Sequence, residues 1–297
     1  MLTGKRVIVT GGNSGIGYGA AQTFAELGAD VVLACRDVGK GEDAAGRIRD
    51  GRARGEVTVL ELDLADLASV RAFAETITAR FPVVDVLVNN AGLMAVPGRL
   101  TTADGFELQF GVNHLGHFAL TGLLLGPITR AAAGRVVTVG SAGHWFARLD
   151  PADPQASRRY RKWGAYGRSK LANLLFAYEL DRRLRAAGEA ARSLACHPGV
   201  ARSNVLRTGP EMLGGRRALW VNLGYLLAVS PRRGAMPTVT AAISPGARGG
   251  ECIGPSGALQ LRGRPGPVRT SGRSRDAATA RALWLASEQL TGVRFLS

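Results

Sequence analysis

The amino-acid sequence predicts an α/β protein with a doubly wound parallel sheet that carries helices on both faces. Short apolar runs rich in β-branched residues alternate with helical patterns along the chain, and a glycine-rich turn follows the first run. These runs are almost continuously apolar, as strands are when both faces of a parallel sheet are covered. We therefore expect one domain over residues 1–297, with no linker and no internal repeat.

Six runs qualify as strands of this sheet. They span residues 6–10, 30–34, 57–62, 84–89, 135–140 and 191–196. Two segments depart from the rhythm: the long connection from the fifth strand to the helix around Tyr166, and residues 199–250, where Gly and Pro are scattered. Both follow the carboxyl ends of strands, where open α/β sheets bind ligands. We expect a substrate lid at about 199–250.

The expected lid contains a group of apolar residues whose role the spacing leaves open. They either line an apolar mouth or pack on the sheet or on a second subunit. The residues are Trp220, Leu223, Tyr225, Leu226 and Leu227.

Composition and charge narrow the function classes. Hydrophobic residues make up 46% and charged residues 21%, which is typical of a globular protein. The net charge of +15 favours anionic ligands, and only four of the 38 basic residues are lysine. Because the basic residues are spread along the chain, we expect no nucleic-acid partner, although polyanion binding stays open as an alternative.

The three cysteines, Cys35, Cys196 and Cys252, are far apart and odd in number. This pattern indicates a reducing compartment and argues against a disulfide framework or a metal site. The first apolar run has only four residues, too few for a signal peptide, and residues 218–230 fall short of the ~20 that a membrane span requires. We expect a cytoplasmic protein without a membrane span.

The first strand leads directly into the turn TGGNSGIG, residues 10–17, and then into a helical pattern. Glycines in this place permit a tight turn, so that amides at the helix N-terminus face a pyrophosphate. Between a strand and a helix, such a turn predicts dinucleotide binding. The expected cofactor-binding residues here are Gly11, Asn13, Ser14, Gly15, Ile16 and Gly17.

A tyrosine and a lysine four residues apart, Tyr166 and Lys170, begin an apolar helix. Residues at this spacing share a helix face, so both side chains can point into one cavity. Bringing a phenol with a pKa of ~10 into use near pH 7 requires about 4 kcal/mol. One ammonium about 4 Å away contributes about that much at an effective dielectric constant of ~20. We therefore expect Lys170 to lower the pKa of Tyr166.

Two further polar residues are candidates for the same site. Ser141 ends the fifth strand, and Asn113 lies in the middle of a helical pattern, where asparagine is a poor helix former. His114 and His117 share a helix face, but no third ligand of suitable spacing is visible, so packing is expected and no metal. His144 follows Ser141 closely, and the sequence leaves open whether its side chain contacts the substrate.

With NNAG at 89–92 and the Tyr166-x-x-x-Lys170 pair, the sequence resembles the short-chain dehydrogenase/reductase family over nearly its whole length. The resemblance implies a single-domain Rossmann fold that holds a nicotinamide cofactor. It also implies a tetrad: Ser141 binds the substrate carbonyl oxygen, Tyr166 supplies the proton, Lys170 grips the nicotinamide ribose, and Asn113 holds a water of the proton relay. The remaining cofactor contacts that it implies are Asp63, Leu64, Asn90, Ala91, Gly92, Pro198, Gly199 and Ser203, the last replacing the usual threonine.

The end of the second strand bears on the choice between NADP and NAD. Relatives that prefer NAD place an acid there, and by register this chain has Cys35. Arg36 follows and is able to pair with a ribose 2′-phosphate, which favours NADP(H). The alternative is that Arg36 is only a solvated arginine and that Asp37 binds the ribose, but Asp37 is well placed to cap the next helix.

Within the family, NHLGHF at 113–118, the long insertion before Tyr166 and HPG at 197–199 resemble one branch. It contains retinol dehydrogenases, protochlorophyllide reductases, WW-domain oxidoreductases and bacterial polyketide-tailoring ketoreductases. This resemblance implies NADPH-dependent reduction of a ketone or aldehyde on a bulky lipophilic small molecule, with a place in secondary metabolism. Alternatives are a dehydrogenase of a lipophilic alcohol and a catalytically idle NADP-binding regulator. A homodimer or homotetramer is also implied as an option.

Overall fold

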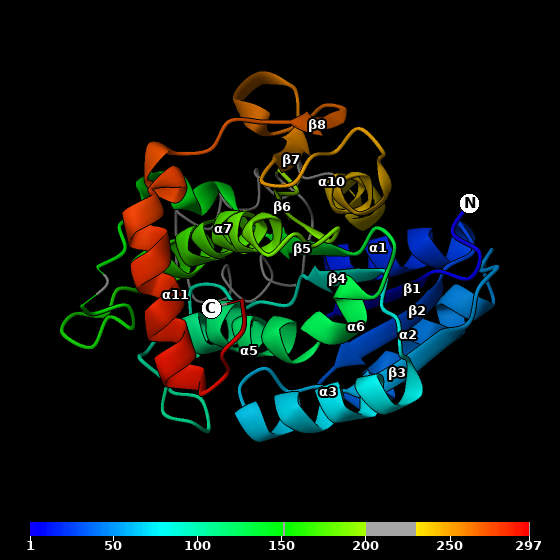
Figure 1. Cartoon of the computed structure of the whole chain (residues 1–297), viewed down its shortest axis with the longest axis horizontal. Helices are drawn as coiled ribbons and strands as arrows, with labels where there is room; N and C mark the ends of the chain where they lie inside the picture. The colour runs from blue at the N-terminus through cyan, green and yellow to red at the C-terminus, as the bar shows by residue number, and fades with distance from the viewer. Residues whose placement is uncertain (151, 200–229, 297) are drawn as a thin grey trace, which may run out of the picture.

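The computed structural model describes residues 1–150, 152–199 and 230–296. Its strands form one eight-stranded sheet in the order β3-β2-β1-β4-β5-β6-β7-β8 (Figure 1). Neighbouring strands are parallel from β3 to β7, and β8 joins β7 antiparallel. From the adjacent strands β1 and β4, successive strands are added toward opposite edges of the sheet, β2 and β3 on one side and β5 to β8 on the other. This arrangement confirms the expected doubly wound α/β fold. The strands are β1 (Arg6–Thr10), β2 (Asp30–Cys35), β3 (Val57–Glu61), β4 (Val86–Asn89), β5 (Arg135–Val139), β6 (Arg192–Cys196), β7 (Cys252–Pro255) and β8 (Pro265–Pro267).

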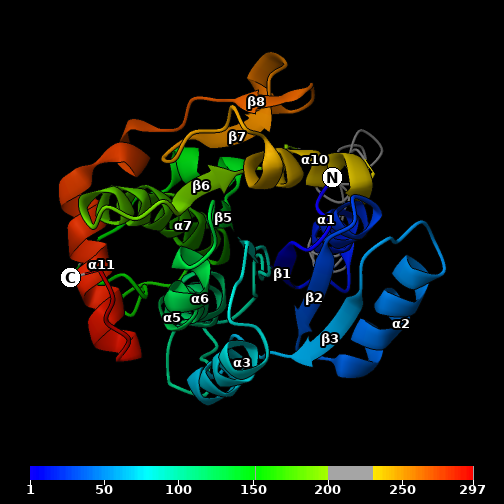
Figure 2. The same cartoon turned by 45° about the vertical axis from the view of Figure 1, so that its right-hand side comes forward.

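Helices cover both faces of this sheet. The helices are α1 (Gly15–Glu26), α2 (Val38–Arg49), α3 (Leu67–Arg80), α4 (Leu108–Phe110), α5 (Gly116–Leu123), α6 (Leu125–Thr129), α7 (Lys162–Ala186), α10 (Pro231–Ile243) and α11 (Ala277–Thr291). Apolar residues of α1, α2 and α10 form a core against one face, and those of α3, α5, α7 and α11 form a core against the other. Figure 2 shows α10 beside α1 and α11 beside α7.

The expected lid at 199–250 is described only in part. Its later residues form α10, which packs on α1 and belongs to the core of the sheet. This helix therefore does not cover the carboxyl ends of the strands. Residues 200–229, including the apolar group from Trp220 to Leu227 and the expected cofactor residue Ser203, lie outside the described residues, so the lid stays a prediction there.

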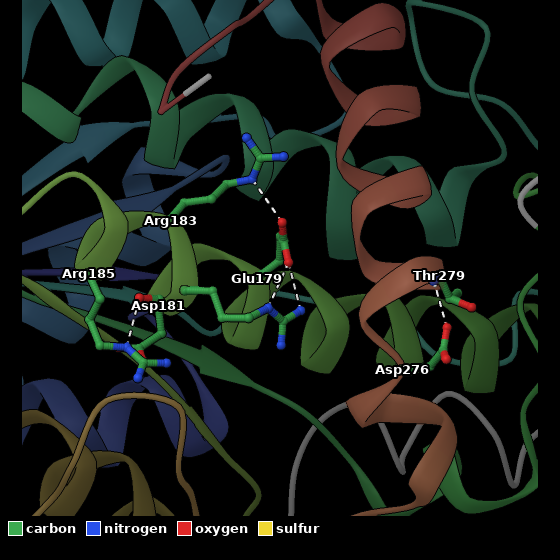
Figure 3. A network of polar contacts seen from close by, with 7 residues as sticks. Glu179, Asp181, Arg183, Arg185, Asp276 and Thr279 are labelled. Atoms are coloured by element: carbon green, nitrogen blue, oxygen red, sulfur yellow. Dashed lines mark hydrogen bonds and ion pairs between the residues drawn. The ribbon is translucent and has the colours of Figure 1, made fainter.

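The longest helix, α7, carries Tyr166 and Lys170 in its first turns, and ion pairs connect side chains near its other end (Figure 3). The nearly buried Glu179 accepts from Arg182 at 2.6 Å and from Arg183 at 3.0 Å. Buried Asp181 pairs with Arg185 at 2.9 Å and accepts from the amide of Ser193. The ion pairs lie within α7, and the hydrogen bond between Asp181 and Ser193 joins the helix to the start of β6. No helix in the described ranges is long and apolar enough to cross a membrane.

Candidate active site

A cavity of about 910 Å³ opens at the carboxyl ends of the parallel strands. This is where an open α/β sheet of this winding binds its ligand. Every sequence-predicted site residue lines the cavity except Asn113, which lies beneath its wall, and Ser203, which is outside the described residues. The predicted residues on the wall are Gly11, Asn13, Ser14, Gly15, Ile16, Gly17, Arg36, Asp63, Leu64, Asn90, Ala91, Gly92, Ser141, Tyr166, Lys170, Pro198 and Gly199.

The glycine-rich turn forms one end of the cavity. Gly11 and Gly15 have φ angles of 64° and 53°, a region that glycine enters without strain. A Cβ on Gly17 would overlap the carbonyl oxygen of Gly11 and lie 2.5 Å from Nδ2 of Asn90. The side chain of Ser14, the N-cap of α1, makes no capping bond, and the first turn of α1 has no acidic residue. The amides at this helix end lie at the wall and suit an anionic group.

The segment after β4 is held against the end of β1 by a buried threonine. Oγ1 of Thr10 accepts from the amides of Asn90 and Ala91 at 2.9 and 3.0 Å, and Nδ2 of Asn90 donates to the Thr10 carbonyl at 2.8 Å. Nε2 of His117 lies 2.9 Å from the same hydroxyl. Burial lowers the pKa of His117 to about 3, so the ring stays neutral and fixes this junction. Neither Thr10 nor His117 was among the predicted site residues.

Tyr166 and Lys170 face the cavity together, as their helical spacing predicts. Nζ of Lys170 lies 6.0 Å from the centre of the Tyr166 ring and donates to the carbonyl oxygen of Val139 at 3.1 Å. The lysine is 5% exposed, and Nδ2 of Asn173 donates to the same carbonyl at 3.2 Å. The end of β5 thus holds the ammonium close to Gly92 on the opposite wall.

The electrostatics of this pair differ from the expectation. Burial raises the pKa of Tyr166, and its hydrogen bond with Ser141 offsets this only in part. Burial also lowers the pKa of Lys170 to about 8. The expected lowering of the tyrosine pKa by the lysine is therefore wrong for this structure, because burial of the phenol is the largest influence on its pKa. At neutral pH the phenol keeps its proton, and Lys170 is mostly charged.

Ser141 begins a 3-10 turn, Ala142–Phe146, that packs against α7. Its Oγ accepts from the amide of Gly143 at 3.3 Å, which leaves the hydroxyl proton of Ser141 available as a donor. A Cβ on Gly143 would lie 3.4 Å from the Tyr166 ring, so the turn runs close to that side chain. His144, whose contact with substrate was left open, is 2% exposed and does not line the cavity.

Asn113 occupies a π-helical turn, Gly111–Leu115, between α4 and α5. Such turns are rare and are often found at functional sites. Its Oδ1 accepts from the amide of Leu93 at 2.7 Å, and its Nδ2 donates to the Leu93 carbonyl at 2.9 Å and to Oγ of Ser169 at 2.9 Å. The asparagine that fits a helix poorly is thus fully buried and holds the loop after β4 against α7.

The end of β2 has the arrangement that the sequence suggests. Arg36 is exposed on the cavity wall. Asp37 caps α2, accepting from the amide of Lys40 at 3.0 Å and pairing with its Nζ at 2.6 Å. The expected cap is confirmed. Burial raises the pKa of Cys35 to about 11, so the end of β2 carries a neutral thiol.

Sequence reasoning missed the apolar part of the wall. These side chains come from the segment after β4 and from the part of the chain that leads into α5. Their positions, just after NNAG or shortly before Asn113, were the sequence signal that could have identified them. These residues are Leu93, Met94, Leu108 and Val112. His114 is buried, bonds to Ser287 at 2.9 Å, and has its pKa lowered to about 3, in keeping with a packing role. No group of residues suited to a metal ion occurs in the described part of the chain.

Comparison with known proteins agrees with this geometry. The short chain dehydrogenase family model matches residues 5–212. Human retinol dehydrogenase 12 is 41% identical over 99% of this chain and 88% of that protein, and human retinol dehydrogenase 13 is 40% identical over 98% and 86%.

Solved structures show the same fold. A protein from Mycobacterium paratuberculosis has a TM-score of 0.81 at 44% identity, with 99% of this chain and 96% of that chain covered. The Pseudomonas aeruginosa RhlG/NADP complex has a TM-score of 0.69 at 26% identity, with 88% and 98% covered. The chain belongs to the short-chain dehydrogenase/reductase family of oxidoreductases, and its branch resembles the retinol dehydrogenases.

Proposed function

We propose that this protein reduces a ketone or aldehyde on a bulky lipophilic molecule with NADPH. One observation carries the proposal: Ser141, Tyr166 and Lys170 line the same cavity as the glycine-rich turn. A proton donor, a carbonyl-binding hydroxyl and a phosphate-binding helix end therefore face one ligand space. Reduction of a carbonyl requires its oxygen to lie about 3 Å from the hydroxyl groups of both Ser141 and Tyr166.

The residues present fit a dinucleotide. The turn at Gly17 leaves no room for a Cβ, and the uncapped end of α1 offers amides to a pyrophosphate. Asp63 and Leu64 would border the adenine, Asn90 to Gly92 its ribose, and Pro198 and Gly199 the nicotinamide. When bound, the cofactor supplies a hydride for the carbonyl carbon.

The protein's own residues then complete the reduction. Ser141 donates its hydroxyl proton as a hydrogen bond to the carbonyl oxygen and polarises it. Tyr166 transfers its phenolic proton to that oxygen, so hydride and proton together convert C=O into CH–OH. The ammonium of Lys170 stabilises the negative charge on the phenolate, and Asn113 anchors the route by which Tyr166 regains its proton. Because burial raises the pKa of Tyr166, the phenol carries its proton at neutral pH and is available as the general acid.

Arg36 supports NADPH over NADH. A guanidinium exposed on the wall beside the neutral thiol of Cys35 is suited to a 2′-phosphate, and Asp37 is engaged by Lys40. The fold alone does not decide between NADPH and NADH, because solved relatives include the NADP complex above and a Brucella melitensis reductase complexed with NADH.

The substrate class is inferred from the apolar wall and from the relatives. Leu93, Met94, Leu108 and Val112 give the cavity that contains Ser141 and Tyr166 hydrophobic lining. Relatives named retinol dehydrogenases support a second candidate, oxidation of a lipophilic alcohol. A role in secondary metabolism, a cytoplasmic location and a homodimer or homotetramer stay predictions.

The test is stopped-flow oxidation of NADPH with a panel of bulky ketones and aldehydes, followed by the reverse reaction with the product alcohols. We expect NADPH oxidation in the presence of a lipophilic carbonyl and slower formation of NADPH from the alcohol at pH 7. Turnover only from the alcohol would favour the dehydrogenase. Tight NADPH binding with no turnover in either direction would favour the regulator. Salt-sensitive retention on DNA would instead support polyanion binding.

A further inference from the structure

His144 makes two buried hydrogen bonds that the proposed reaction does not use. Its Nδ1 lies 2.6 Å from the carbonyl oxygen of Ser141, three residues earlier in the same turn. Its Nε2 lies 3.2 Å from the backbone nitrogen of Ser271, which is 127 residues away in the chain. The imidazole thus joins the turn that carries the proposed carbonyl-binding serine to the segment before α11.

The chemistry of the two partners fixes the protonation of the ring. A backbone amide only donates, so Nε2 of His144 accepts from Ser271 and carries no proton. A carbonyl oxygen only accepts, so the proton of the neutral ring is on Nδ1 and is donated to Ser141. Both bonds are satisfied by this single tautomer, in a side chain that is 2% exposed.

The segment that receives His144 is itself well anchored. The carbonyl of Ser271 accepts from the amide of Ser274 at 3.0 Å and from its hydroxyl at 2.7 Å, which closes a 3-10 turn, Gly272–Arg275. Just before it, the hydroxyl of Thr270 lies 3.1 Å from that of Tyr178 on α7. Ser271 is 5% exposed. His144 is therefore connected, through the segment that contains Thr270 and Ser271, to the helix that bears Tyr166.

We propose that His144 is a positioning residue, which sets the hydroxyl of Ser141 against Tyr166 by tying the turn after β5 to the backbone of Ser271. This inference rests on the proposed function, since the position matters for a carbonyl bound between the two hydroxyls. A Cβ built on Gly143, which lies between Ser141 and His144, would be 3.4 Å from the Tyr166 ring, so the turn runs close to the ring and a shift of the turn changes the relative placement of Ser141 and Tyr166. Displacements of this kind lower the rate of chemistry without weakening cofactor binding.

The sharpest test removes one donor atom. Ser271 has a φ of −59°, close to the value of about −65° that proline imposes, so Ser271→Pro deletes the amide hydrogen in a compatible backbone. Ser271→Ala is the matched control, because it loses the hydroxyl and keeps the amide. We expect Ser271→Pro to lower kcat about 10-fold with the KM for NADPH unchanged, and Ser271→Ala to keep the wild-type kcat.

A second pair of variants acts on the ring. His144→Phe loses both bonds and is expected to lower kcat by 10-fold to 100-fold, on the order of the losses that misplacement causes. His144→Asn keeps a donor near the place of Nδ1 and should recover part of this loss. Nitrogen NMR of ¹⁵N-histidine-labelled protein reads the tautomer without turnover and should show Nδ1 protonated in the wild type.

Two results overturn the inference: a proton on Nε2 of His144, or equal kcat values for Ser271→Pro and Ser271→Ala in an enzyme whose wild type is active. Absence of turnover in the wild type with every carbonyl overturns the proposed function instead, and with it the catalytic part of the inference. The two failures are thereby separated.

Discussion

Tyr166 and Lys170 show how burial changes the meaning of a residue pair. Their spacing alone suggested an acidic phenol, yet the buried phenol is a weaker acid than a solvated one and the buried ammonium loses its proton more readily. At neutral pH both groups keep the protonation states that a reductase requires. The tyrosine arrives protonated, and the lysine is still mostly charged when the phenol has given up its proton.

The lowered pKa of Lys170 predicts a pH dependence in the alkaline range. A lysine is charged when protonated, so a pKa of about 8 means that its charge is lost as pH rises through about 8. We expect kcat/KM for NADPH, which reports the free enzyme, to be constant near neutrality and to fall above about pH 8. The profile is measured at saturating ketone, and Arg36→Ala, whose missing charge does not titrate in this range, should show the same fall. A profile that is level up to about pH 10 would contradict the assignment.

Arg36 tests the choice of cofactor at the level of one side chain. Arg36→Ala should raise the KM for NADPH by 10-fold or more and change the KM for NADH less than about 2-fold, because only NADPH carries the 2′-phosphate. Steady-state kinetics with both cofactors measure this difference. Arg52→Ala, which removes an exposed arginine that does not line the cavity, is the charge control. Equal changes for both cofactors would remove Arg36 from the proposed role.

At the scale of elements, the turn from β1 to α1 predicts a strong effect from one methyl group. Gly17→Ala places a Cβ against the carbonyl of Gly11, so the turn must open and its amides lose their alignment. We expect the dissociation constant for NADPH to rise about 100-fold in a fluorescence titration.

Gly46→Ala provides the matched control for the glycine experiment. A Cβ there meets nothing within 4 Å, and the residue lies inside α2. It should leave NADPH affinity unchanged and raise the free energy of unfolding by about 0.5–1 kcal/mol, since alanine is the better helix former. Similar losses of affinity in both variants would show that the turn is not the binding element.

The sequence predicted the elements that have a strong pattern and missed those that do not. Six strands follow their apolar runs closely, whereas β7 and the edge strand β8 were missed because they are short and contain Gly and Pro, which are weak strand formers. The misfit of Asn113 in a helix predicted a special position, but not that a π-helical turn would provide it. The type of an element can be predicted from its local sequence pattern, whereas a local irregularity such as the π-helical turn cannot.

Contacts between distant residues were the least predictable part of the site. His117 reaches Thr10 across 107 residues, and His144 reaches Ser271 across 127. Neither pairing has a sequence signal, because each depends on how the strand ends and the segment before α11 are brought together by the fold. The family motifs, by contrast, placed the residues that line the cavity, since most of them directly follow a strand end and the Tyr166–Lys170 pair shares one helix face.

At the scale of the whole molecule, α11 closes the face of the sheet that carries α7. Trp284 on α11 is 1% exposed and packs against Phe118 and Phe295 with ring centres 5.1 and 4.6 Å apart. Arg183 on α7 lies over the same indole at 4.5 Å and donates to the carbonyl of Leu296 at 2.7 Å. α11 therefore stabilises the helix that carries Tyr166.

Truncating this contact should destabilise the protein without changing its chemistry. Trp284→Ala is expected to lower the free energy of unfolding by about 3–5 kcal/mol, the cost of removing a large buried aromatic side chain. Denaturant titration measures it, and Leu285→Ala, which truncates a side chain on the same helix at a residue that is 60% exposed, should cost less than about 1 kcal/mol. A small loss at Trp284 would mean that α11 is not part of the cooperative core.

The central claim is that Tyr166 supplies the proton while the cofactor supplies the hydride. Single-turnover reduction of a lipophilic ketone by the NADPH-loaded protein tests it directly when wild type and Tyr166→Phe are compared. We predict a loss of about 100-fold to 10,000-fold in the rate of NADPH oxidation, the usual contribution of a general acid, with NADPH affinity unchanged within about 2-fold. A phenylalanine variant that oxidises NADPH at the wild-type rate would contradict the claim.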